Sequence, residues 1–305
     1  MLFSTRDLTV LNNTLVGSIQ VIIASICWGT LGIFSTQLGK LGFDSFEIAT
    51  LRIVTAGVIV SLLLPSLLAT VKTLTVKQWS GLFLQSVIGV LGMTLCYFYA
   101  VQQVGVSLAV ALLYTAPVFS LVLAKVLLRE TISSKSALLA MVAVLGVACL
   151  MVGGKVTLNA GVIVGLLSGL CYSLYGILGK KAMANSDTQT LPAPMIFFSS
   201  VMFSALLLLL LPQTYHAYIT LFKLPSFTLL LVLGLSLIGT VIPFFLYMTA
   251  LQKLPATKAS VFTIIEPLTA IILATVLLKQ PLHTLQLVGI GLIIFATLAN
   301  TLGNN

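Results

Sequence analysis

The stretch "FTIIEPLTAIILATVLLKQ", residues 262–280, holds one acidic side chain, Glu266, in an otherwise apolar run. If this run is a helix that begins near residue 256, Glu266 lies about 15 Å from its start. A carboxyl group in such apolar surroundings usually faces a partner or a cavity, and it can hold and release a proton near neutral pH. Two functional roles stay open: binding a cationic group of a substrate, or carrying a coupling proton. The alternative is a structural role, as a protonated acid hydrogen-bonded to a neighbouring helix.

Prolines interrupt the same apolar segments. Proline lacks an N–H group, so it leaves the carbonyl four residues earlier without its helical partner. The predicted helix breaks are Pro117, Pro243 and Pro267, which affect the carbonyls of Leu113, Gly239 and Thr263, respectively. Freed carbonyls near the middle of a membrane can bind an ammonium group or a water molecule, or permit bending. A simple packing kink is the alternative.

Aromatic side chains with a polar tip form the next candidate group. They suit an amphipathic substrate, and their rings can stack on a cation. The predicted substrate residues of this type are Trp28, Tyr97, Tyr114, Tyr172, Tyr175 and Tyr247.

Arg52 lies about eight residues into the apolar segment 44–64 and has no basic counterpart in the apolar segment 193–212. It could meet a substrate carboxylate, close a gate through an acidic partner, or fix a structural contact, and of these we favour the structural contact. Asp44 and Glu47, at the start of the same segment, are expected to be solvated. His216 and His283 are expected in loops.

The composition indicates whether these segments are surrounded by water or by lipid. Of the 305 residues 59% are hydrophobic and 7% are charged, and the mean hydropathy is +1.18. A soluble domain carries about a quarter charged residues, so this chain predicts an all-α polytopic membrane protein. The net charge of +9 is then the excess of Lys and Arg that cytoplasmic loops carry, which excludes nucleic-acid binding.

Ten apolar segments have the length of about 20 residues that a membrane span needs. They are 14–38, 44–64, 78–101, 105–128, 134–153, 159–180, 193–212, 226–252, 256–279 and 283–302. With a cytoplasmic N-terminus, nine basic residues lie on the inside and four on the outside. This asymmetry favours both termini in the cytoplasm.

The chain also matches itself. At an offset of 150 residues, Ser86, Ile88, Gly89, Tyr97 and Pro117 meet Ser236, Ile238, Gly239, Tyr247 and Pro267. At an offset of 144, "CWGTLG" (27–32) meets "CYSLYG" (171–176). Each half holds five spans, an odd number, so we expect the second half to cross the membrane inverted. Such inverted repeats are typical of secondary transporters with a site near the midplane.

The layout and four motifs carry a resemblance to a known family. The motifs are "CWGTLGIFSTQL", "LRIVTAG", "LLYTAPVFSLVLAKVLLRE" and the stretch 262–280. Together they resemble the drug/metabolite transporter superfamily, in particular its ten-helix branch built from two EamA-type repeats. Gln280 departs from the pattern, because the family usually has Glu there. The resemblance implies export of amino acids or other small organic molecules across a bacterial inner membrane.

The sequence therefore predicts two inverted five-helix repeats at 14–153 and 159–302, with a cytoplasmic segment 1–13, a linker 154–158 and a tail 303–305. The predicted function is a secondary transporter that exports a small amino-acid-like or amphipathic metabolite by alternating access, proton-coupled through Glu266. Uptake or facilitated diffusion of a similar solute is the alternative, and an intramembrane enzyme acting on lipid is a remote one. We expect no enzymatic activity, cofactor or metal, since no metal-ligand, phosphate-loop or catalytic-triad spacing occurs. The expected partners are the solute, protons and lipid, for a monomer or a homodimer.

Overall fold

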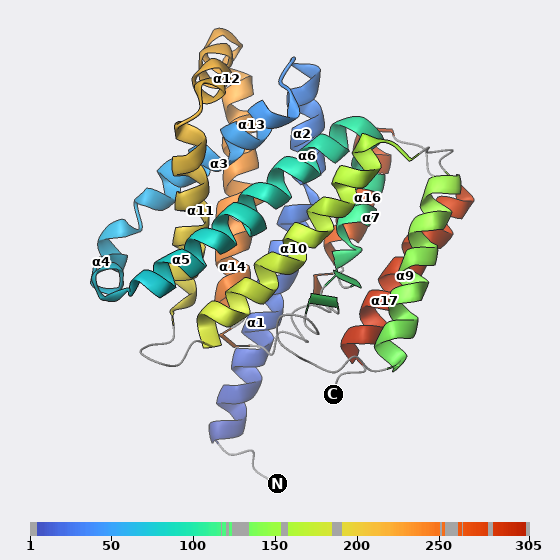
Figure 1. Ribbon diagram of the computed structural model, residues 1–305, viewed down its shortest axis with the longest axis horizontal. Coiled ribbons are helices and arrows are strands. Elements are labelled where there is room, and N and C mark those ends of the chain that lie inside the picture. Colours follow the sequence, from blue (N-terminus) through green and yellow to red (C-terminus); the bar gives the residue numbers. More distant parts are fainter. Residues whose placement is uncertain are drawn as a thin grey trace.

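Every regular element in the described part of the chain is a helix (Figure 1). The computed structural model describes residues 5–116, 118–119, 122–123, 134–153, 158–184, 191–250, 252–253, 262–263, 265–279 and 283–302. The predicted helix break at Pro117 lies outside these residues.

The elements of the first half are α1 (Thr5–Gly29), α2 (Leu31–Lys40), α3 (Ser45–Ser61), α4 (Leu64–Thr73), α5 (Val76–Leu84), the π-helix η1 (Gln85–Gly92), α6 (Met93–Val104), α7 (Val106–Leu113) and α9 (Ser134–Gly153). Those of the second half are α10 (Ala160–Ala184), α11 (Ala193–Leu209), α12 (Pro212–Lys223), α13 (Ser226–Ser236), the π-helix η2 (Leu237–Val241), α14 (Ile242–Ala250), α16 (Ile265–Leu277) and α17 (Thr284–Leu302).

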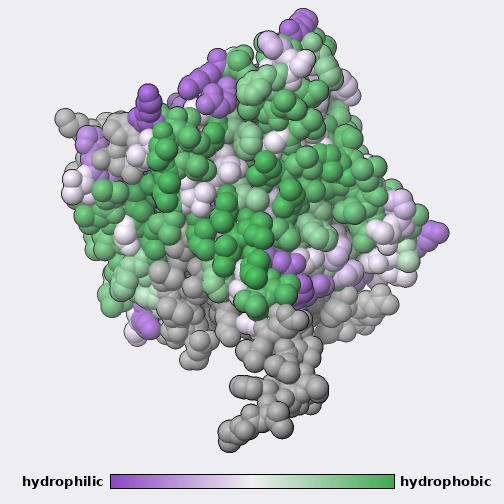
Figure 2. Space-filling view, turned by 180° about the vertical axis from the view of Figure 1, so that it is seen from behind, coloured by the Kyte–Doolittle hydropathy of each residue, from purple (hydrophilic) through white to green (hydrophobic). Residues whose placement is uncertain are grey.

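Several helices have the length and apolar composition of membrane spans. Within the described residues, four qualify: Thr14–Lys40, Val76–Val104, Ala160–Leu178 and Ser226–Ala250. The number rises to six if each of two bent helix pairs counts as one span, and two shorter apolar helices lie at Ile265–Leu277 and Thr284–Ala296. Large apolar side chains are exposed along these helices and cover the middle of the face shown in Figure 2, as expected of a surface that contacts lipid.

Two of the helices end in sharp bends. The axis turns by 87° between α3 and α4 and by 91° between α11 and α12. In Figure 1, α4 and α12 lie at opposite ends of the bundle. The prediction that His216 lies in a loop is wrong, because Pro212 starts a new helix in which His216 belongs to the second turn.

The helices α3 and α11 correspond closely. Each has 17 residues and each is followed by a bent helix. Gly57 and Ala205 occupy the same position in the two helices, and they face each other: a Cβ atom added to Gly57 would lie 2.5 Å from the Cβ of Ala205. The two helices therefore pack against each other at the same position of each.

The two π-helices interrupt the spans at corresponding positions. Gly89 lies in η1 and packs on Tyr175 of α10, and Gly239 lies in η2 and packs on Leu31 of α2. Gly89 and Gly239 are 150 residues apart, and the residues they contact, Leu31 and Tyr175, are 144 residues apart. These two spacings are the offsets at which the sequence matches itself. The helix α10 therefore packs on η1, and α2 packs on η2, at corresponding positions of the sequence matches.

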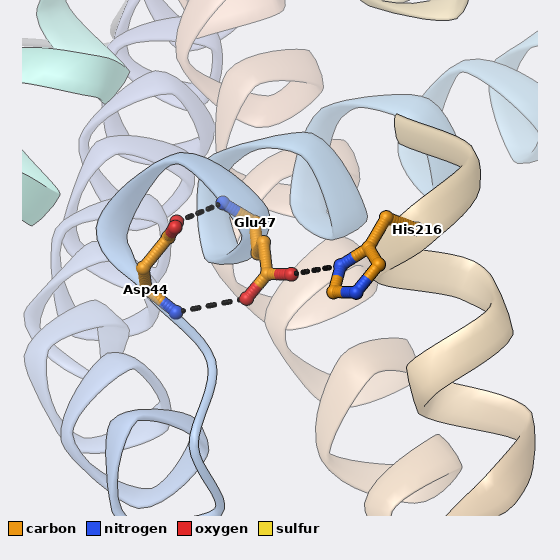
Figure 3. Close-up of polar contacts among 3 residues, drawn as sticks. All are labelled: Asp44, Glu47 and His216. Atoms are coloured by element: carbon orange, nitrogen blue, oxygen red, sulfur yellow. Dashed lines mark hydrogen bonds and ion pairs between the residues drawn. The ribbon is translucent and has the colours of Figure 1, made fainter. Parts of the chain in front are cut away.

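Figure 3 shows how the start of α3 is held. The Glu47 N–H donates to Asp44 Oδ1 at 2.8 Å, and the Asp44 N–H donates to Glu47 Oε2 at 3.0 Å, which forms a capping box. The other carboxylate oxygen of Glu47 lies 2.9 Å from His216 Nδ1 of α12. The prediction that Glu47 is solvated is wrong: it is 9% exposed, because its carboxylate has partners on both sides.

Candidate functional site

Glu266 lies in the first turn of α16 and is 7% exposed. Its Oε2 atom is 2.9 Å from the Tyr114 hydroxyl, at the end of α7. The helix α16 also contacts α1 and α2. The carboxyl group is thus buried against the first half of the chain and is not exposed on the molecular surface.

The carbonyl that Pro267 deprives of its helical partner contacts the same tyrosine. The Tyr114 Oη atom lies 2.7 Å from the Thr263 carbonyl oxygen, which also accepts the Glu266 N–H at 3.0 Å. One phenol of the first half therefore contacts both a carboxyl group and a carbonyl group of the second half.

Arg52 is fully buried in α3 and donates to three groups in two other elements, α6 and η2. Its Nε donates to Thr240 Oγ1 at 2.7 Å, its Nη1 to Thr94 Oγ1 at 3.1 Å, and its Nη2 to the Gly239 carbonyl at 3.0 Å. That carbonyl is the one that Pro243 deprives of its helical partner. The guanidinium also lies over the ring of Phe98, 5.4 Å from the centroid.

The charge of Arg52 has no direct counter-ion in the described part of the chain. Among those residues no carboxylate lies within 4.0 Å of the guanidinium. Glu266 lies within the range of electrostatic interaction with Arg52, although the two groups form no ion pair. Burial of a guanidinium without a direct ionic partner is unfavourable, and its hydrogen bonds to Thr240, Thr94 and Gly239 offset part of that cost.

The predicted aromatic residues gather around these two groups. Tyr97, Tyr114, Tyr172 and Tyr247 all lie within electrostatic range of Glu266. The Trp28 ring contacts Tyr247 edge-on, with centroids 5.4 Å apart. Tyr175 is linked to Trp28 through Phe244, which lies 5.7 Å from Tyr175 and 5.2 Å from Trp28.

Sequence reasoning missed four residues of this cluster: Thr94, Phe98, Thr240 and Phe244. Three of them come directly after a residue already identified from the sequence: Thr240 follows Gly239, Phe98 follows Tyr97 and Phe244 follows Pro243. Thr94 has no such signal. Within the described residues, no group of three or more His, Cys, Asp or Glu side chains is placed to bind a metal ion.

The apolar helices and the family to which the chain is related define an integral membrane transporter. The sequence model described as "EamA-like transporter family" matches residues 15–152 and again residues 159–302. The chain belongs to this family, within the drug/metabolite transporter superfamily.

Curated relatives carry transporter names. The chain is 28% identical over 273 residues to the uncharacterized transporter YetK of Bacillus subtilis, which covers 85% of this chain and 80% of that protein. It is 27% identical over 283 residues to an uncharacterized transporter of Archaeoglobus fulgidus, covering 92% and 95%. It is 25% identical over 214 residues to the threonine/homoserine exporter RhtA of Escherichia coli, covering 69% and 68%. A solved crystal structure has a TM-score of 0.61 at 16% identity and covers 95% of this chain and 96% of its own.

Proposed function

We propose that this chain is a secondary active transporter that exports a small amino-acid-like or amphipathic metabolite across the bacterial inner membrane, by alternating access and in exchange for protons. The observation that carries the proposal is Glu266, whose carboxyl group is buried and lies 2.9 Å from the Tyr114 hydroxyl of the other half. A buried ionisable group is expensive in a membrane protein and is usually functional.

We further propose that the halves are inverted five-helix repeats, giving ten spans with both termini in the cytoplasm. Figure 1 supports the inversion, since α1 runs upward from the N-terminus whereas α10, from light green to yellow, runs downward. The placement of α4 and α12 at opposite ends of the bundle, after the equivalent helices α3 and α11, supports it too. Two such halves can exchange conformations, so that the site faces each side in turn.

The charges of the site indicate the kind of solute. A zwitterion could place its ammonium group at Glu266, among the tyrosine rings, and its carboxylate at the guanidinium of Arg52. Arg52 supports this placement because three of its five N–H donors bond to Thr240, Thr94 and Gly239, and the other two make no hydrogen bond within the described residues. The name of RhtA, a threonine/homoserine exporter, supports the same solute class.

Flux measurements in proteoliposomes test this proposal. Labelled threonine, the matching amine without the carboxylate and the matching acid without the ammonium group would be offered under an imposed pH gradient. We expect the zwitterion to move fastest and its movement to depend on the gradient.

Glu266→Gln should abolish the dependence on the pH gradient. Glu47→Gln, at the start of α3 and outside the aromatic cluster, is the matched control and should keep it. Absence of flux for all three solutes, or flux that follows the solute gradient alone in the unaltered protein, would contradict the proposal.

A further inference from the structure

We infer that Tyr114 is the positioning residue through which the two halves of the chain respond to the protonation of Glu266. This inference rests on the proposed coupling role of Glu266, and it adds the group that transmits the change. Its basis is the number of protons shared by three neighbouring oxygen atoms: the Tyr114 hydroxyl, the Thr263 carbonyl and Glu266 Oε2.

The Tyr114 hydroxyl has one proton to donate and lone pairs with which to accept. Its oxygen lies 2.7 Å from the Thr263 carbonyl oxygen, which can only accept, and 2.9 Å from Glu266 Oε2. If the hydroxyl donates to the carbonyl, the second short contact is a hydrogen bond only when the carboxyl group donates to Tyr114. Both contacts are therefore satisfied as separate hydrogen bonds only when Glu266 is protonated.

Loss of the proton changes this arrangement. An ionised Glu266 can only accept, so the single proton of Tyr114 turns to the carboxylate, with which it forms a stronger, charge-assisted bond. The Thr263 carbonyl then loses the Tyr114 hydroxyl and keeps the Glu266 N–H. Since Pro267 denies that carbonyl its helical partner, the start of α16 has one bond fewer to α7.

No other charged group in the described surroundings of Glu266 can take over this role directly. α3 contributes Arg52, which is bonded to Thr240, Thr94 and Gly239. α6, α10 and α14 contribute the phenols of Tyr97, Tyr172 and Tyr247. α1 between residues 14 and 29, and α2 before Lys40, carry no charged side chain, although both helices contact α16.

The test is Tyr114→Phe, which removes the hydroxyl and keeps the ring. Infrared difference spectra of the purified protein would record the carbonyl stretch of a protonated carboxylic acid, assigned to Glu266 by its loss in Glu266→Gln. We expect that band in the unaltered protein at neutral pH, and we expect Tyr114→Phe to shift it to higher wavenumber. Tyr99→Phe, which removes a phenol outside the cluster, should leave the band in place.

Flux gives the second readout. Solute-for-solute exchange moves no net protons, so it serves as the internal reference for each variant. In proteoliposomes, the stimulation of Tyr114→Phe flux by a pH gradient, measured relative to the variant's own solute exchange, should fall about tenfold, the effect of one hydrogen bond to a charged group. Tyr99→Phe should retain the full stimulation.

An unshifted band in Tyr114→Phe, or an unaltered pH profile of its flux, would overturn the inference about Tyr114 even if transport is proton-coupled. If no solute moves at all, the proposed function fails, whereas the infrared band still decides whether Tyr114 is bonded to a protonated Glu266.

Discussion

The contact between Gly89 and Tyr175 joins η1 to α10, and Gly89→Ala probes it. A Cβ atom at Gly89 would lie 2.7 Å from Tyr175 Cβ and 2.9 Å from Tyr175 Cα. Carbon atoms in ordinary contact are about 3.5–4.0 Å apart, so η1 and α10 would have to separate by about 1 Å. Because a backbone atom is in the way, rotation of a side chain cannot relieve the clash.

The magnitude follows from two opposing effects. Overpacking of this kind costs about 1–3 kcal/mol of the free energy of unfolding, whereas alanine gains about 0.5–1 kcal/mol over glycine in a helix. Gly176→Ala is the matched control, because nothing lies within 4 Å of a Cβ atom at that position of α10. Both variants share the helix-propensity gain, so their difference, about 1–3 kcal/mol, reports the clash alone.

The assay is thermal unfolding of the purified protein in detergent, followed by helical circular dichroism. A difference of this size corresponds to several degrees in the melting temperature, with Gly89→Ala below and Gly176→Ala at or above the unaltered protein. Equal melting temperatures for the two variants would show that η1 and α10 are not packed at Gly89, and the arrangement of the halves would then be wrong.

Two further variants test other contacts by the same melting assay. Asp44→Ala removes the cap of α3 and should destabilise the protein by about 0.5–2 kcal/mol. The His216 side chain is 75% exposed, so His216→Ala should cost less than about 1 kcal/mol, and an equal or larger effect than that of Asp44→Ala would refute this ranking. Arg52→Lys keeps the charge, but a compact ammonium group cannot reach partners in α6 and η2 together, so we expect a loss of about 1.5–3 kcal/mol, and unchanged melting would show that these contacts contribute nothing.

The correspondence between the two halves was predictable, because it depends on which residue types recur at the offsets of the sequence matches. The glycine pair Gly89 and Gly239 and the matched segments 27–32 and 171–176 indicated where the halves correspond. A lone carboxyl group in an apolar run indicated that Glu266 would avoid lipid, since exposure there is expensive. The choice of partner did not follow, because it depends on how α7 and α16 meet in three dimensions.

The bends and the π-helices were not predictable for a different reason. A hydropathy pattern gives the length of an apolar run and no direction, so α12 was expected to be a loop and His216 was placed in it. The π-helical stretch around Gly239 has the same composition as an α-helix. The burial of Glu47 depends on α12 lying beside α3, which only the bend at Pro212 brings about.

Two carbonyls deprived of their partners by proline accept side chains from the opposite half. Pro243 leaves the Gly239 carbonyl to Arg52, and Pro267 leaves the Thr263 carbonyl to Tyr114. These are bonds from a side chain to a backbone carbonyl, so they connect the halves and are not part of the backbone ladder of any helix. Their donors can therefore change partners when the charge of the site changes. Arg52 and Tyr114 both lie near the carboxyl group whose protonation we propose to drive transport.

Proton release on solute binding tests that coupling most directly. The purified protein would be titrated in a weakly buffered detergent solution with the solute that the flux experiments identify, while a pH-sensitive dye records released protons. The account predicts release of about one proton per bound solute from the unaltered protein near neutral pH, and none from Glu266→Gln. Solute binding without proton release in the unaltered protein, or equal release from Glu266→Gln, would contradict it.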